Sequence, residues 1–298
     1  MDEFKNFDTV SDYNRFHNND TLHPLVSVVD YAKSEPQGYF NMRLGFYAII
    51  LKDVKCREMK YGRSFYDYDE GTLVFLAPGQ AVKFVNTNLT YQPKGYALIF
   101  HPDLLRGTHL GKSIQNYSFF NYAVNEALHI SKAERELVLD CLKKIEYELK
   151  NAIDKHSRQL IVSNIELFLQ YCVRFYDRQF ITREIPNKGV IEAFEDLLNA
   201  YYQEAEAKEI GLPSVAYFAE QLHLSANYFG DLVKRETGQS AQDYILSKVI
   251  NVAKEKVLDT QKSIKEISYE LGFSYPQHFI RLFKTKIGVT PNEYRHLN

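Results

Sequence analysis

The chain has 298 residues, of which 45% are apolar and 25% are charged. This length and apolar content fit two globular domains with ample cores and exclude an intrinsically disordered protein. The formal net charge of −2 excludes a chain that binds nucleic acid through bulk positive charge alone.

We expect neither an export signal nor a membrane span. The chain starts with the polar stretch Met-Asp-Glu-Phe-Lys-Asn-Phe, and its longest apolar runs, such as Phe46 to Leu51, are too short to cross a bilayer. The three cysteines, Cys56, Cys141 and Cys172, are scattered, and no Cys-x-x-Cys pair occurs. These features predict a cytoplasmic protein without membrane contact, whose thiols are reduced and structural.

Short apolar runs separated by Gly, Pro and Asp fill the region from Leu22 to His101. The runs are Leu25 to Val29, Phe46 to Leu51, Leu73 to Ala77 and Tyr96 to Phe100. This pattern is typical of a β-sandwich or β-barrel. The segment from Asp69 to Gln80, with sequence DEGTLVFLAPGQ, resembles the second conserved strand-turn-strand of cupin barrels. Residues 1–130 are therefore expected to form a cupin-like effector-binding or regulatory domain.

The metal-binding pattern of cupin enzymes is missing. Those enzymes use a His-x-His pair, a carboxylate and a further His after the Pro-Gly turn, but here Gln80 follows that turn and His101, His109 and His129 are isolated. We expect no metal, no cofactor, no catalytic residue and no enzyme activity. A small-molecule effector of unknown identity could contact aromatic residues such as Tyr47, although alternating aromatics are more often plain core.

Two helices are predicted next, from Ser131 to Lys150 and from Ser157 to Phe180. Apolar residues line two faces of the second helix, which is more than one barrel needs to cover. The additional apolar residues are Leu160, Leu167, Leu169 and Val173. The polar stretch 182–189 then predicts a linker.

The same pattern occurs twice between Ser214 and Tyr294. An offset of 50 residues aligns Phe229 with Phe279 and Gly238 with Gly288, while upstream the offset is 49. In each copy, apolar residues at i, i+3, i+4 and i+7 predict a short helix, followed by a three-residue break and a second short helix. The two stripes are Val215, Phe218, Ala219 and Leu222, and Ile264, Ile267, Ser268 and Leu271. We predict helix-turn-helix units at about 214–238 and 263–288, in an all-helical domain of residues 190–298.

Start and stop signals agree with this spacing. Ser263 with Glu266 predicts a capping box, and Gly238 and Gly288 stand where a left-handed helix end is expected. Thr290, Pro291 and Glu293 predict a further helix that starts at Pro291. A long connecting helix is expected between the units, and its predicted apolar face is Tyr244, Ile245, Ile250, Ala253, Val257 and Leu258.

These motifs resemble the AraC family of bacterial transcription regulators over roughly residues 188–298. The most specific stretch is GFSYPQHFIRLFKTKIGVTPNEYR, from Gly272 to Arg295, and its partner is AYFAEQLHLSANYFGDLVKRETG, from Ala216 to Gly238. The resemblance implies binding of double-stranded DNA, contact with RNA polymerase, and a sensor role for the cupin-like domain. It also implies that residues 131–181 are a helical dimerisation element that forms a homodimer. The expected fold is an α+β multidomain protein.

In this family the second helix of each unit enters the major groove. By this resemblance, Gln277 and Arg281 match the family's base-contacting positions. Gln can pair with adenine and Arg with guanine. Gln277 could instead close a capping box with Ser274, and Arg281 could be a solvated surface residue. We expect His278 to lie at the surface or beside phosphate rather than to bind metal, since no second ligand stands at the required spacing.

The equivalent positions in the first unit are Asn227 and Asp231. Asn227 keeps the amide chemistry of Gln277, whereas Asp231 can accept only from cytosine and is repelled by phosphates, so base contact by this helix is in question. Lys234, Arg235 and Lys284 are expected to contact phosphate or merely to add solubility.

The charge of the C-terminal region is modest. From Ile210 onward there are eleven Lys and Arg against nine Asp and Glu, a balance of +2. This predicts weak non-specific affinity for DNA, so that dimerisation or specific contacts must hold an operator. The sequence predicts a dimeric DNA-binding regulator, with activation the commoner outcome in the family. Two alternatives stay open: a ligand-independent co-regulator, and a cupin enzyme with an appended DNA-binding module.

Overall fold

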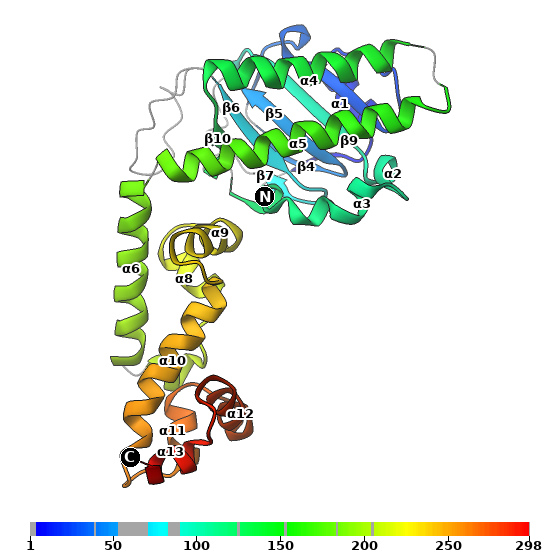
Figure 1. Cartoon of the computed structure of the whole chain (residues 1–298). Helices are drawn as coiled ribbons and strands as arrows, with labels where there is room; N and C mark the ends of the chain where they lie inside the picture. Colours follow the sequence, from blue (N-terminus) through cyan, green and yellow to red (C-terminus); the bar gives the residue numbers. More distant parts are fainter. Residues whose placement is uncertain are drawn as a thin grey trace. The chain divides into compact units, whose positions relative to one another are not determined.

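The computed structural model describes residues 4–38, 40–52, 71–82, 90–123, 126–151, 154–182, 184–203 and 206–297. The chain divides into two compact units, Met1–Thr182 and Arg183–Asn298. The first contains β-sheets and two long helices, and the second is all helical (Figure 1). This is the predicted α+β class.

Ten short strands and several helices make up the part of the first unit that the structure describes. The strands are β1 (Phe4–Phe7), β2 (Val26–Asp30), β3 (Gln37–Gly38), β4 (Asn41–Leu44), β5 (Tyr47–Lys52), β6 (Thr72–Leu76), β7 (Ala81–Val82), β8 (Thr90–Tyr91), β9 (Gly95–Phe100) and β10 (Leu128–His129). The helices are α1 (Val10–Phe16), η1 (Tyr31–Lys33), α2 (Pro102–Leu105), α3 (His109–Ser113), η3 (Ile114–Asn116), η4 (Ser118–Asn121), α4 (Lys132–Lys150) and α5 (Ser157–Thr182). The four predicted strand runs correspond to β2, β5, β6 and β9.

The central layer is a five-stranded antiparallel sheet in the order β10-β6-β5-β9-β2. A three-stranded sheet, β1-β4-β7, contributes to the core on one face of it. Alternate residues point to opposite faces of a strand, and those of β5, β6 and β9 that enter this core are Ala48, Ile50, Val74, Leu76, Ala97 and Ile99. They pack with Phe7, Tyr13 and Phe46, which are at most 2% exposed.

Helices cover the other face, where α4 and α5 lie side by side across the sheet (Figure 1). Phe75 of β6 contacts Phe119 at a ring distance of 4.5 Å and Tyr176 of α5 at 6.0 Å. Both faces of the sheet are buried, which explains continuous apolar runs rather than strict alternation in the sequence. Tyr47 stacks on Phe100 at 5.2 Å and contacts Phe120 edge-on at 5.0 Å, so it lies on this helix-covered face and not in the core between the sheets. Its contact with an effector stays a prediction.

The predicted strand-turn-strand is partly described, since residues 69 and 70 lie outside the described residues. Thr72–Leu76 and Ala81–Val82 are strands on either side of the Pro78-Gly79 turn, but they belong to different sheets. Closure into a cupin barrel stays a prediction. Within the described residues no cluster of His, Cys, Asp and Glu could hold a metal ion. Cys141 and Cys172 are buried free thiols, and Cys56 is outside the described residues.

The two long helices appear where the sequence predicts them. Ser131 and Glu134 close a capping box at the start of α4. Leu169 is fully buried in the core, contrary to its predicted place on an excess apolar surface, whereas Leu160, Leu167 and Val173 are 46%, 42% and 38% exposed. Arg178 holds α5 against α4, because it donates to both carboxylate oxygens of Glu134, at 2.7 and 3.0 Å, and to the His129 carbonyl at 2.6 Å.

Replacing Arg178 by alanine should destabilise the first unit by about 2 kcal/mol, because the largely buried carboxylate of Glu134 loses its cation. The matched control is Lys144→Ala, which removes an exposed i,i+4 pair with Asp140 and should leave the unfolding midpoint unchanged. Urea unfolding followed by hydrogen-exchange mass spectrometry of α4 and α5 peptides measures both. Equal effects of the two substitutions would contradict the role assigned to Arg178.

Eight helices form the described part of the second unit. They are α6 (Glu184–Gln203), α7 (Glu206–Ile210), α8 (Val215–Gln221), α9 (Ala226–Thr237), α10 (Ala241–Val257), α11 (Ile264–Glu270), α12 (Pro276–Ile287) and α13 (Pro291–Leu297). The boundary between the two units lies inside the predicted linker 182–189, but residues 184–189 are the first turns of α6. Pro186 is compatible with this position, since the first turn of a helix needs no N–H donors. None of the described helices combines the length and apolarity needed to cross a bilayer.

Both predicted helix-turn-helix units are present, as α8-α9 and α11-α12. Ser263 and Glu266 form the predicted capping box, and Gly238 and Gly288 end their helices with φ angles of 74° and 93°. The connecting helix α10 buries Ile245, Ile250, Ala253 and Val257 as expected, together with Val249. Leu258 was expected on that face but is 46% exposed, because α10 ends at Val257.

Candidate nucleic-acid interface

Helices α9 and α12 occupy equivalent places around one core. Phe229 and Val233 of α9 and Phe279 and Phe283 of α12 are fully buried in the same cluster as Ile245, Val249 and Ala253 of α10. Each of the two helices therefore has one face fixed by packing and turns the opposite face outward. Because both helices pack in the same core as α10, the packing against α10 fixes the position of the exposed face of α9 relative to that of α12.

The outward face of α12 carries the predicted base-contacting residues. Gln277, Arg281 and Lys284 are exposed and follow one another at i, i+4 and i+7, so they share one face of the helix. The capping-box alternative for Gln277 is wrong, because the N-cap residue is Tyr275, which makes no side-chain cap hydrogen bond, and Pro276 is the first helical residue. The amide of Gln277 is thus not used to start the helix.

Two aromatic groups flank this face at its N-terminal end. Tyr275 is 61% exposed, and its ring lies 5.5 Å from the ring of His278, which is also exposed. The sequence prediction included His278 but not Tyr275. An exposed large aromatic ring next to a helix start is the signal that could have identified it.

The equivalent face of α9 is chemically different. Asn227, Lys234 and Arg235 are exposed, whereas Asp231 is half-buried. Gly230 lies between Asn227 and Asp231, and a methyl group there would meet no atom within 4 Å. The face of α9 therefore carries one amide, one carboxylate and two cationic side chains. The face of α12 carries one amide and two cationic side chains but no carboxylate.

The turns of the two units differ at one backbone position. His223 has a φ angle of 57°, and Gly272 at the same place in the second unit has a φ of 88°. A Cβ on Gly272 would lie 2.4 Å from both the carbonyl carbon and oxygen of Gly211, so only glycine fits there. Tyr201 of α6 donates to the Gly211 carbonyl at 2.9 Å. The backbone before α8 thus packs directly on the turn of the other unit.

Arg295 of α13 binds the end of α10 rather than facing solvent. Its Nε donates to the Val257 carbonyl at 2.7 Å, and its Nη2 donates to the carbonyls of Asp259 and Lys262 at 3.1 and 2.9 Å. The last carbonyls of a helix lack partners within it, and a guanidinium can satisfy several of them at once. Sequence reasoning counted Arg295 as a surface charge and missed this role.

Replacing Arg295 by lysine should destabilise the second unit by about 2 kcal/mol, because an ammonium group cannot reproduce three hydrogen bonds from one planar fork. The matched control is Arg281→Lys on the exposed face of α12, which should not change stability. Hydrogen exchange of the 240–297 peptides across a urea series gives both values. A stable Arg295→Lys protein would show that other groups satisfy these carbonyls.

Ion pairs and caps hold the outer helices in place. Lys286 of α12 lies 3.7 Å from Asp243 of α10, and Glu270 of α11 pairs with Lys262 at 2.7 Å. Thr290 and Glu293 form the predicted cap of α13, and the hydrogen bond from the Thr290 backbone N–H lowers the pKa of Glu293. The carboxylate is therefore ionised at neutral pH, as the cap requires.

Comparison with known proteins gives matches centred on these helices. A helix-turn-helix domain model matches residues 218–296. The Bacillus subtilis protein named "Uncharacterized HTH-type transcriptional regulator YfiF" is 32% identical over 152 residues, which cover 49% of this chain and 45% of that protein. The melibiose operon regulatory protein of Escherichia coli strain K12 is 32% identical over 80 residues, which cover 27% of this chain and 26% of that protein.

One solved structure with similarity to this chain is the C-terminal domain of the two-component response regulator yesN from Fusobacterium nucleatum. It is 28% identical, has a TM-score of 0.32, and is matched over 98% of its length by 36% of this chain. The matched segments thus span less than half of the two curated relatives but nearly all of this domain.

Proposed function

We propose that this chain is a sequence-specific regulator of transcription that binds double-stranded DNA, because a helix-turn-helix domain model matches its C-terminal unit and its motifs resemble the AraC family. One observation carries the proposal. Two equivalent helices, α9 and α12, have their apolar faces fixed in a single core and their polar faces exposed. This is the geometry in which a helix can enter a major groove.

Base recognition is assigned chiefly to α12. Gln277 can donate to and accept from adenine, and Arg281 can donate twice to guanine, each worth about 1–3 kcal/mol of discrimination. Lys284, Lys234 and Arg235 supply phosphate contacts that position the domain without specifying sequence. His278 lies toward the edge of the same face, and Asn227 is the most suitable base-contacting residue of α9.

The first unit would regulate this activity. The exposed side chains of Leu160, Leu167 and Val173 on α5 support a homodimer contact, because such apolar surface gains by burial. A small-molecule effector bound by the N-terminal unit would then shift the population of dimers able to bind an operator. We propose activation through contact with RNA polymerase as the output, in the cytoplasm and without enzyme activity.

Selection of bound duplexes from a randomised DNA library tests the proposal. Wild-type protein should recover two half-sites about one helical turn apart, roughly 34 Å between centres. The double substitution Gln277→Ala and Arg281→Ala should relax the preference at one half-site only. Recovery of no motif, with and without cell extract as a source of effector, would overturn sequence-specific binding.

A ligand-independent regulator is the second candidate, and one observation favours it. Buried aromatic rings of Phe7, Tyr13 and Phe46 fill the described space between the sheets, at ring distances of 5.2 Å and 5.7 Å. A motif recovered by purified protein, unchanged in strength by cell extract, would support this candidate over effector control.

A further inference from the structure

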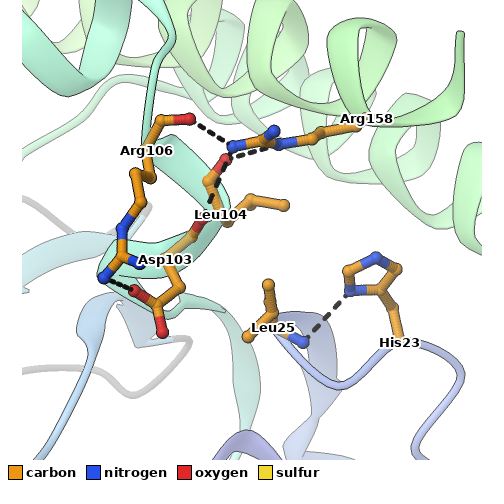
Figure 2. A pocket seen from close by; sticks show the side chains of 6 residues that line it. All are labelled: His23, Leu25, Asp103, Leu104, Arg106 and Arg158. Carbon is orange, nitrogen blue, oxygen red and sulfur yellow. Dashed lines mark hydrogen bonds and ion pairs between the residues drawn. The ribbon is translucent and has the colours of Figure 1, made fainter.

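A surface hollow of about 450 Å³ lies on the first unit, away from the space between the sheets. Three segments that are far apart in the sequence line it: the loop before β2 (His23 and Leu25), helix α2 with the residue after it (Asp103, Leu104 and Arg106), and the first turn of α5 (Arg158). Figure 2 shows Arg158 reaching from α5 to the backbone of α2, with His23 below Arg158 in the view and across from Asp103 and Arg106.

Arg158 is held in a fixed position at this hollow. Its Nε donates to the Leu104 carbonyl at 3.0 Å, and its Nη2 donates to the carbonyls of Arg106 and Asp103 at 2.5 and 3.5 Å. Because α2 is a single turn, no following helical turn satisfies the Leu104 carbonyl, whereas the Asp103 carbonyl also accepts from the Arg106 backbone N–H at 3.4 Å. The bonds orient the guanidinium, and Nη1 has no hydrogen-bond partner among the described residues.

His23 offers a second free donor. Its Nδ1 accepts from the Leu25 backbone N–H at 3.1 Å, which places the ring proton on Nε2. Burial lowers the pKa of His23, so the ring is neutral at pH 7 with this N–H available. In the described part of the chain no group bonds to Nε2.

Arg106 offers a third set of donors. Its Nη2 pairs with Asp103 Oδ1 at 2.7 Å, while Nε and Nη1 have no described partner, and the side chain is 82% exposed. The other oxygen of Asp103 lies 3.4 Å from His101 Nδ1. His101 Nδ1 itself accepts from the Asp103 backbone N–H at 3.2 Å, so it supplies no proton to this carboxylate oxygen. Among the described residues, the groups left over at the hollow are the N–H donors of Arg158, His23 and Arg106 and this one oxygen, and the two guanidinium charges exceed the single carboxylate charge.

We propose that this hollow binds a small organic oxyanion, a carboxylate or a phosphate ester. Arg158 Nη1 and His23 Nε2 donate to the anion from fixed positions, and the exposed side chain of Arg106 closes over it. Planar guanidinium groups suit both kinds of oxyanion, and Leu25 and Leu104 offer an apolar surface to the rest of the ligand. Because the Arg158 side chain is already held by hydrogen bonds, it loses little conformational entropy when the ligand binds.

A bound ligand would connect the loop before β2 and α2 to the first turn of α5. Helix α5 is continuous over 26 residues and ends at Thr182, the last residue of the first unit. Control of transcription through this helix rests on the proposed function. The binding itself does not.

Thermal-shift and calorimetric titrations of the full chain with sodium succinate and with sodium phosphate test the site, with sodium chloride at equal ionic strength as reference. Binding of millimolar order or tighter is expected for so small a ligand. Arg106→Gln should weaken it at least about tenfold. The control Arg174→Gln, which removes an exposed arginine elsewhere on α5, should bind as wild type does.

The outcomes separate cleanly. A specific response to succinate identifies a carboxylate ligand, and a response to phosphate alone identifies a phosphate ester. No response beyond that of chloride, or an equal response in Arg106→Gln, overturns the proposal. Arg106 is exposed, so its substitution keeps the test valid even if Arg158→Gln unfolds the chain. Binding without any effect on DNA affinity would retain the site and remove only its regulatory role.

Discussion

Replacing Gly272 by alanine should destabilise the second unit by about 4 kcal/mol. Two costs add: a φ of 88° is strained for any residue with a side chain, and the new Cβ would lie 2.4 Å from the carbonyl carbon and oxygen of Gly211. Both clashing groups are backbone, and Tyr201 anchors the Gly211 carbonyl, so neither can move aside cheaply. The loss should appear as early urea unfolding of α11 and α12 in hydrogen-exchange mass spectrometry.

Gly288→Ala provides the matched control. Its φ of 93° carries the same backbone strain, but a Cβ there would meet no atom within 4 Å, so the cost should be about 1 kcal/mol. The difference between the two substitutions isolates the contact with Gly211. Equal losses would mean that the turn relaxes away from Gly211 and that the two helix-turn-helix units are less tightly joined than the structure indicates.

Local signals in the sequence were sufficient for the second unit. A stripe at i, i+3, i+4 and i+7 predicts a buried helix face, and Ser263, Gly238 and Thr290 mark helix ends by local hydrogen bonds or local backbone geometry. These features depend on residues within one turn of each other. The strand runs were predicted for a similar reason, since each is a short apolar stretch between turn residues.

The features that were missed depend on partners far away in the chain. Arg295 contacts Val257, 38 residues earlier, and Gly272 contacts Gly211, 61 positions earlier. Nothing near either residue distinguishes it from a surface arginine or an ordinary turn glycine. The face on which Tyr47 lies could not be predicted, because both faces of its sheet are buried and the apolar run does not reveal which residues point inward. The helical conformation of residues 184–189 was not predicted either, because Pro and Gly suggest a break but do not exclude a helix start.

Alanine substitutions at equivalent positions of α9 and α12 should have different effects on DNA affinity. Arg281→Ala should weaken binding to the selected operator by about 2 kcal/mol, and together with Gln277→Ala by about 4 kcal/mol, as two bidentate base contacts disappear. Asp231→Ala removes an acid from a face that lies against phosphate, so it should leave affinity unchanged or raise it. The two positions match in the repeat but differ in charge.

Fluorescence anisotropy with the operator and with duplexes mutated in one half-site separates the contributions. Lys284→Ala is the control for phosphate contacts that do not depend on sequence. It should weaken binding to every duplex alike and reduce the slope of log affinity against log salt concentration by about one unit. Because the Asp231 side chain is half-buried, its removal can also change stability. Unfolding curves must therefore show that Asp231→Ala is as stable as the wild type before the affinities are compared. If Asp231→Ala instead weakened binding and removed a preference for cytosine in the first half-site, α9 would contact bases through its carboxylate. The proposed division of labour, with α12 recognising sequence and α9 positioning the domain, would then be wrong.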